Sequence, residues 1–159
     1  MKKVLIGMIL VFLANSLAYS QEVVYIKKQK FEGYIYPKDF PIWGFPPENN
    51  RYTPQKQDIE QAENIIQDNI RFICTELMHK RYGYCRTKKL RKYIRQYVGY
   101  VTEDKQIIIK IFFSKKGTFN NHTFKDDIIL VQDGGSDYWQ ISVNLTIRTL
   151  FDLFVNGEG

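Results

Sequence analysis

The feature that most limits the fold is one amphipathic helix pattern followed by a long region with the pattern of β-strands. Thr53 is suited to cap this helix, and Pro54 is suited to its first turn. Apolar side chains then recur every three or four residues on one stripe: Ile59, Ala62, Ile66, Ile70, Ile73 and Leu77. Because burial of each large aliphatic side chain contributes roughly 1.5 to 3 kcal/mol, another element has to cover the stripe.

The residues after the helix predict an antiparallel meander. The candidate strands are Tyr93–Val101, Ile107–Phe113, Ile128–Gln132, Tyr138–Leu145 and Leu150–Val155. Gly134 and Gly135 accept positive φ and indicate a hairpin between the third and fourth of these strands. We therefore expect an α+β fold in which one long N-terminal helix packs on a curved, four- to five-stranded antiparallel meander sheet.

The chain divides into three parts. These are a signal peptide over residues 1–20, an irregular N-terminal segment rich in proline and aromatic residues over 21–52, and a helix-plus-sheet domain over 53–159. In the second part, Val23–Ile26 and Tyr34–Tyr36 are short strand candidates. The prolines from Pro37 to Pro47 predict a loop, because proline cannot donate to a β-ladder.

The first residues have the three-part pattern of a cleaved secretory signal. Lys2 and Lys3 are positively charged, residues 4–14 are apolar or glycine, and Ala18-Tyr19-Ser20 offers small residues to a signal peptidase. At about 1.5 Å per residue, this apolar stretch reaches only about half of a ~30 Å hydrocarbon core. We expect an exported, soluble protein, periplasmic or extracellular, without a transmembrane segment after cleavage.

A basic band lies in the middle of the chain, where no acidic residue occurs between Glu76 and Glu103. It consists of Lys80, Arg81, Arg86, Lys88, Lys89, Arg91, Lys92 and Arg95, and the binding residues expected from it are Arg86, Lys88, Lys89, Arg91, Lys92 and Arg95. Such a cluster attracts an acidic protein face, an anionic polysaccharide or lipid head groups. Nucleic acid is a less suitable ligand, because no recognition motif accompanies the charge. The same residues also suit a purely structural role, since cations commonly protect edge strands from pairing.

Cys74 and Cys85 raise the question of a disulfide in an exported chain. Gly83 allows the chain to turn back between them, and a bridge requires about 6 Å between the two Cα atoms. The alternative is that Cys74 is a buried apolar thiol and Cys85 is free. We do not expect a catalytic cysteine, because nothing marks either thiol as activated by a nearby histidine.

The two histidines do not indicate a metal site, since neither is spaced from a second histidine or cysteine as ligands are. His79 falls on the last helical turn, where a positive charge favours the helix dipole. His122 lies close in sequence to Asp126 and Asp127, so an acid–base pair is one reading and a solvated loop is the other. No cofactor is expected.

Several motifs resemble small exported bacterial proteins of cystatin-like or NTF2-like architecture. They are the helix, Arg95–Tyr100, Val131–Gly135 with Trp139 after it, and Val155–Gly157, and the resemblance covers roughly residues 53–157. It implies an architecture and no chemistry. The inhibitory loop of cystatins has the pattern Gln-x-Val-x-Gly, and Gln96-Tyr97-Val98-Gly99 is one residue short and lies inside a predicted strand, so the resemblance does not imply protease inhibition.

These observations favour an exported, noncatalytic binding or interaction module that engages an anionic partner through the basic band. The alternative is a small-molecule cup or small enzyme of NTF2-like form, with a pocket lined by Trp139 and His122.

Overall fold

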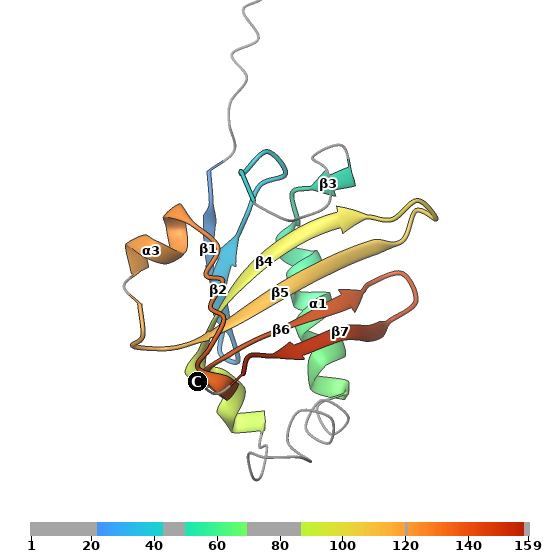
Figure 1. Cartoon of the computed structure of the whole chain (residues 1–159). Coiled ribbons are helices and arrows are strands. Elements are labelled where there is room, and N and C mark those ends of the chain that lie inside the picture. The colour runs from blue at the N-terminus through green and yellow to red at the C-terminus, as the bar shows by residue number, and fades with distance from the viewer. Residues whose placement is uncertain (1–21, 43–49, 70–86, 120, 158–159) are drawn as a thin grey trace, which may run out of the picture.

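The computed structural model describes residues 22–42, 50–69, 87–119 and 121–157, except for the side chains of 87–89, 121 and 122 (Figure 1). The strands of this part are β1 (Val24–Lys27), β2 (Glu32–Ile35), β3 (Arg51–Tyr52), β4 (Tyr93–Val101), β5 (Ile107–Lys115), β6 (Tyr138–Asn144) and β7 (Thr149–Val155). The helices are α1 (Lys56–Asp68) and α3 (Asn121–Asp126), with the 3-10 helices η2 (Thr87–Lys92) and η3 (Gly135–Asp137).

The described strands form one mixed sheet of seven strands. Its order is β1-β2-β4-β5-β6-β7, and β3 pairs with β4 beyond the end of β2. All neighbours are antiparallel except β2 and β4, which run parallel with Gly33, Tyr34 and Ile35 opposite Arg95, Gln96 and Tyr97. The N-terminal segment is therefore built into the sheet beside its longest strands.

The predicted fold, one long helix on a four- to five-stranded antiparallel meander, is wrong. The sheet is larger and mixed, because the segment before the helix contributes β1, β2 and β3 to it. The helix α1 has 13 residues, and the predicted stripe positions after it, Ile70, Ile73 and Leu77, lie outside the described residues. The strand candidates near residues 23–26 and 34–36 do fall on β1 and β2. What the sequence pattern could not reveal is that β2 pairs in parallel with a strand about sixty residues later.

The two faces of the sheet carry separate apolar clusters. On the face covered by α1, here called the inner face, Ile59, Ala62 and Ile66 of the helix pack on strand residues that include Ile109 and Ile141. On the opposite, outer face, α3 and the segment after it cover β1, β2 and the start of β4. Figure 1 shows α1 behind the sheet and α3 beside β1. The outer surface of β5, β6 and β7 has no helix over it in the described structure.

The helix α1 begins at a cap different from the predicted one. Gln55 is the N-cap, and its backbone N–H donates to Asp58 Oδ2 at 2.8 Å in a capping box. Thr53 instead accepts a hydrogen bond from the backbone N–H of Lys38 at 3.1 Å. Thr53 therefore holds the preceding loop, and the helix begins after it.

The segment predicted as the strand Ile128–Gln132 is not a strand in the structure. Ile128 is buried in the outer cluster, and Asn156 Nδ2 donates to the carbonyls of Val131 and, at 3.3 Å, Asp133. Since the side chain of Asn156 takes the place of a β-ladder, no hairpin forms here. Gly134 and Gly135, with φ of 100° and 53°, lead into η3 instead.

A buried ion pair links the helix to the centre of the sheet. Arg95 Nε lies 2.6 Å from Glu63 Oε1, and the same oxygen accepts a hydrogen bond from the Tyr97 hydroxyl at 2.9 Å. The Arg95 guanidinium also lies 5.2 Å from the ring centroid of Phe113. Burial raises the pKa of the Glu63 carboxyl, while Arg95 and Tyr97 act in the opposite direction. Removing either partner would leave the other charge without compensation.

We expect Glu63→Gln to lower the free energy of unfolding by about 3 to 5 kcal/mol, because the Arg95 guanidinium stays buried without its counterion. Glu60→Gln is the matched control, since Glu60 is on the same helix and pairs with Lys28 at 2.7 Å, but the side chains of both residues are about half exposed. That change should cost less than about 1 kcal/mol. Urea denaturation of both variants is the measurement, and equal costs would contradict the role given to the buried pair.

Gly33 is required by the close approach of β2 to β4. A Cβ at Gly33 would lie 2.2 Å from the carbonyl oxygen of Arg95, which belongs to the backbone and cannot move aside. We expect Gly33→Ala to destabilise the fold by about 1 to 3 kcal/mol, as overpacking does. Gly157→Ala serves as control, because a Cβ at Gly157 would meet no heavy atom within 4 Å. If thermal unfolding of the two variants coincides, the parallel β2–β4 pairing is wrong.

Candidate binding hollow on the outer sheet face

The structure divides the basic band. Arg91 and Lys92 are exposed at the end of η2, whereas Arg95 is fully buried in the pair with Glu63. Arg95 is therefore not part of a basic surface, because alternation along β4 directs it to the inner face. Arg86 lies outside the described residues, as do the side chains of Lys88 and Lys89. The described part of the band is thus reduced to two exposed cations.

Of the other predicted site residues, the structure describes the side chain of Trp139 alone. Trp139 lies on the inner side, where its ring stacks on Phe113 with centroids 3.6 Å apart. His122 belongs to α3, but its side chain lies outside the described part, and Cys74 and Cys85 lie outside it entirely. The structure therefore tests neither the disulfide nor a pocket shared by Trp139 and His122.

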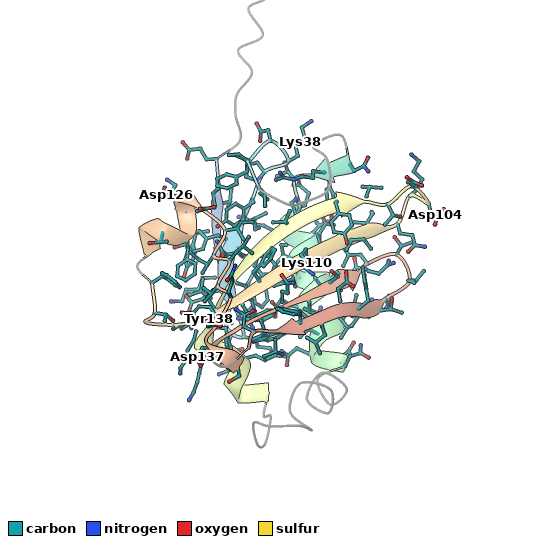
Figure 2. The ribbon with its side chains drawn as sticks, viewed as in Figure 1. Lys38, Asp104, Lys110, Asp126, Asp137 and Tyr138 are labelled. Atoms are coloured by element: carbon teal, nitrogen blue, oxygen red, sulfur yellow. The ribbon has the colours of Figure 1, made fainter. Side chains whose placement is uncertain are left out.

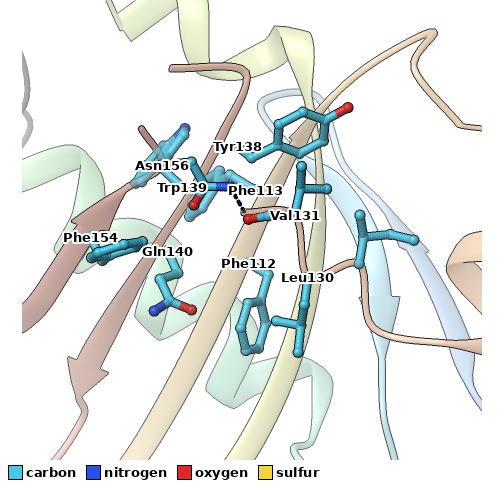
Figure 3. A pocket seen from close by; sticks show the side chains of 10 residues that line it. Phe112, Phe113, Leu130, Val131, Tyr138, Trp139, Gln140, Phe154 and Asn156 are labelled. Carbon is cyan, nitrogen blue, oxygen red and sulfur yellow. Dashed lines mark hydrogen bonds between the residues drawn. The ribbon is translucent and has the colours of Figure 1, made fainter. Parts of the chain in front are cut away.

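A hollow of about 140 Å³ opens on the outer face near the C-terminal end of the chain (Figure 3). Phe112, Gln140 and Phe154 form its floor, and they lie opposite one another on β5, β6 and β7. The segment with Leu130 and Val131 forms the facing wall. Trp139 also contributes to the lining from below. The lining is thus mostly apolar and also includes Gln140, Asn156 and Tyr138.

Buried amide side chains hold the wall of the hollow in place. Gln96 accepts a hydrogen bond from the backbone N–H of Ile129 at 2.8 Å and donates to the carbonyl of Asp127 at 2.7 Å. At the other end, Asn156 donates to the carbonyl of Val131, the contact drawn in Figure 3. Because backbone groups of the segment are satisfied from both sides, it keeps its position without belonging to a strand.

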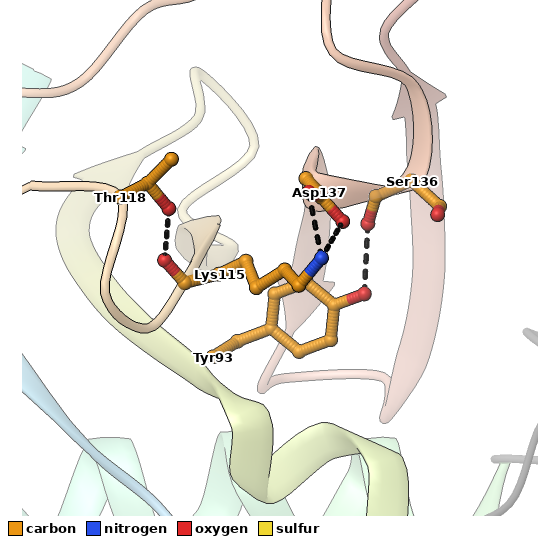
Figure 4. A network of polar contacts seen from close by, with 5 residues as sticks. All are labelled: Tyr93, Lys115, Thr118, Ser136 and Asp137. Atoms are coloured by element: carbon orange, nitrogen blue, oxygen red, sulfur yellow. Dashed lines mark hydrogen bonds and ion pairs between the residues drawn. The ribbon is translucent and has the colours of Figure 1, made fainter.

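A polar network fixes the start of β6 beside the hollow (Figure 4). Lys115 Nζ lies 2.8 Å from Asp137 Oδ2, and the Tyr93 hydroxyl donates to the carbonyl of Ser136 at 2.7 Å. The bond to Asp137 raises the pKa of Lys115. These contacts hold η3 against β4 and β5, so that the following residue, Tyr138, reaches the rim of the hollow.

Lys110 lies next to the hollow on the outer face. It precedes Phe112 by two residues on β5 and stands opposite Ser142 of β6 (Figure 2). Burial lowers its pKa, and the charge of Asp152 on β7 partly offsets this effect. Among the described residues, Lys110 has no hydrogen bond and no ion pair within 4.0 Å. The hollow is therefore flanked by a half-buried ammonium group without a direct partner.

Asp152 owes its position to an irregularity in β7. Its φ is 50°, and the pairing of β6 with β7 shifts register between Gln140 and Ser142. The extra residue is a β-bulge, which lets Phe151 and Phe154 both occupy the outer face although they are three residues apart. Both rings are exposed, by 37% and 56% respectively, so the apolar character of the hollow continues onto the open surface.

In residues 22–42, 50–69, 87–119 and 121–157, no three His, Cys, Asp or Glu side chains are grouped as metal ligands would be. No helix of the described residues is long and apolar enough to cross a membrane. The features that stand out in this part are an apolar hollow and an unpaired ammonium group.

Comparison with known proteins finds no family model, no curated protein and no solved structure that matches this chain. The family resemblance suggested by the sequence motifs therefore has no support from relatives.

The sequence interpretation missed the residues that form the hollow. Lys110 is the single charge within the apolar run Ile107–Phe113, and this was the available signal. A charge in a central strand either has a buried partner or points to a face that is open to water or to a ligand. Leu130 gave no such signal, because its segment has the composition of a buried strand.

We expect Lys110→Met to raise the free energy of unfolding at neutral pH, because methionine removes a partly desolvated charge that lacks a direct partner. The gain should shrink as the pH rises from the lowered pKa of folded Lys110 toward its ordinary value of 10.5, since the charge of the wild-type residue is lost over that range. The exposed Lys125 of α3 supplies the control variant Lys125→Met. Urea midpoints across this pH range test the expectation, and a destabilised Lys110→Met variant contradicts it.

Proposed function

We propose that this protein is a noncatalytic interaction module that holds one apolar side chain of a partner protein in the outer hollow. The size of the hollow carries the proposal. Sites for drug-sized molecules typically measure about 300 to 1,000 Å³, whereas a cavity of roughly 150 Å³ accommodates a single benzene ring. At about 140 Å³, the hollow fits one aromatic or branched aliphatic side chain. The alternative of a small-molecule cup requires a larger space than this.

The surroundings of the hollow support a protein partner. Leu130 in the wall is 62% exposed, Phe154 on the floor is 56% exposed, and Phe151 extends the apolar surface along β7. Protein interfaces commonly centre on a buried aromatic or aliphatic anchor, and exposed apolar residues that adjoin one another mark such sites. A partner that inserts one anchor would also cover these side chains.

Export remains part of the proposal and rests on the signal pattern of residues 1–20. An acidic region of the partner would be attracted by the exposed Arg91 and Lys92, which are the exposed cations of the described part of the basic band. These cations add long-range attraction, whereas the hollow supplies the specific contact.

Titration of the ¹⁵N-labelled protein with N-acetyl-phenylalanine amide, N-acetyl-leucine amide and N-acetyl-asparagine amide tests the proposal by NMR. We expect the two apolar compounds to shift the backbone amide signals of Phe112, Gln140 and Phe154 in a saturable way. Asparagine amide has a comparable size but is polar, and it should leave them unchanged at the same concentration.

Two matched variants locate the site. Phe154→Ser should weaken binding of the apolar compounds at least several-fold, because it removes one side of the floor. Ile147→Ser should have no effect, although Ile147 is equally exposed at 56%, because it lies in the β6–β7 turn and does not line the hollow. The absence of saturable shifts with both apolar compounds would overturn the proposed function.

A further inference from the structure

Lys110 has an unusual position on the outer face. Outward positions of β4, β5 and β6 alternate with those that point to α1, and Lys110 is the single charged residue among them in the described structure. Its neighbours across the strands are Val98 and Ser142, neither of which carries a charge. A charge placed there costs free energy, since its surroundings remove part of its hydration. An anion that arrives with a ligand would offset this cost.

The hollow and Lys110 are spaced along one strand. Phe112, on the floor of the hollow, and Lys110 are outward neighbours on β5, which puts their Cα atoms about 6.6 to 6.8 Å apart. Because the lysine side chain is long and flexible, its Nζ can lie closer to the hollow than this Cα spacing. One terminal residue can therefore place its side chain in the hollow and its carboxylate at the lysine.

A second donor lies at the same place. Gln140 is paired with Phe112 on one side and with Phe154 on the other, and Figure 3 shows its amide between these rings. The side chain of Gln140 has no hydrogen bond to another described residue. A carboxylate beside the hollow could accept hydrogen bonds from Lys110 Nζ and Gln140 Nε2, and bonds to a charged group are the stronger kind.

We propose that the occupant of the outer hollow is the C-terminal residue of a partner protein, with an apolar side chain in the hollow and a free α-carboxylate bound by Lys110 and Gln140. This inference rests on the proposed function and names the chemistry of the partner. An acidic side chain next to an anchor within a chain fits less well, because neighbouring side chains of an extended peptide point to opposite sides.

N-acetyl-phenylalanine and its amide are the probes, since they have nearly the same shape and the acid alone carries a negative charge. We expect the free acid to bind wild-type protein roughly tenfold more tightly at pH 7 and low salt, in line with one charge-assisted hydrogen bond. Lys110→Met should abolish this preference, whereas Lys110→Arg should retain much of it. Raising the salt to about 0.5 M should reduce the preference.

Two peptides separate a terminal carboxylate from an internal acidic residue. Ala-Ala-Ala-Phe with a free C-terminus should bind more tightly than Ala-Phe-Ala-Asp with an amidated C-terminus, in which the acid follows the anchor by two residues. Equal or tighter binding of the second peptide would overturn the inference in favour of an internal acidic motif.

The experiments distinguish failure of the carboxylate inference from failure of the proposed function. If the acid and the amide bind wild-type protein equally, the carboxylate inference falls while the proposed function stands. If the acid keeps its advantage in Lys110→Met, Lys110 is not the anion site and the inference falls as well. If neither of these compounds nor N-acetyl-leucine amide binds, both proposals fall.

Discussion

The structure depends on a charge that is buried in the middle of the sheet. The Arg95–Glu63 pair lies where α1 crosses β4, and the backbone of Arg95 also contacts Gly33 of β2. One residue therefore connects the helix, the central strand and the N-terminal hairpin. Glu63 Oε2 and Arg95 Nη2 have no hydrogen-bond partner among the described residues. The cost of desolvating the two charges therefore offsets much of the stability that their attraction contributes. What the pair provides is a defined position for the helix and a defined face for the side chains of β4, because a one-residue slip of β4 would turn Arg95 to the other face.

The outer face is organised by neutral polar side chains. Gln96, Tyr36 and Asn156 bind carbonyl groups of the segment from Phe124 to Asp133 and hold it over part of the sheet. The segment stops short of β6 and β7, and the hollow is the space left beside it. The site is therefore a consequence of hydrogen bonds that fix the segment at both ends, from Tyr36 and Gln96 on one side and from Asn156 beside the hollow on the other.

Local sequence patterns predicted the parts of the fold that depend on local physics. The bounds of β4 agree with those predicted, the core of β5 and most of β6 were found from alternation, and the buried stripe residues Ile59, Ala62 and Ile66 lie in the core. Pairings between distant segments were missed, since nothing in residues 32–35 specifies a parallel neighbour. Residues 128–132 were assigned wrongly because an apolar run fits a buried segment as well as a strand.

The same limit applies to the site. Arg95 was counted among surface cations, although its alternation with Ile94 and Gln96 places it on the inner face. Lys110 was overlooked, although it interrupts an apolar strand. A run of cations along the chain predicted a basic surface. In a sheet, however, the face to which each side chain points decides whether its charge is exposed.

The bulge at Asp152 also affects the tendency of the protein to self-associate. β7 is the last strand of the sheet, and an unpaired strand next to exposed rings is the usual starting point for fibrous aggregation. A residue with φ of 50° and a negative side chain in the middle of this strand breaks the straight row of backbone groups that another strand would need. The exposed rings of β7 can thus remain available for binding, while the bulge hinders another copy of the chain from adding a strand at this edge.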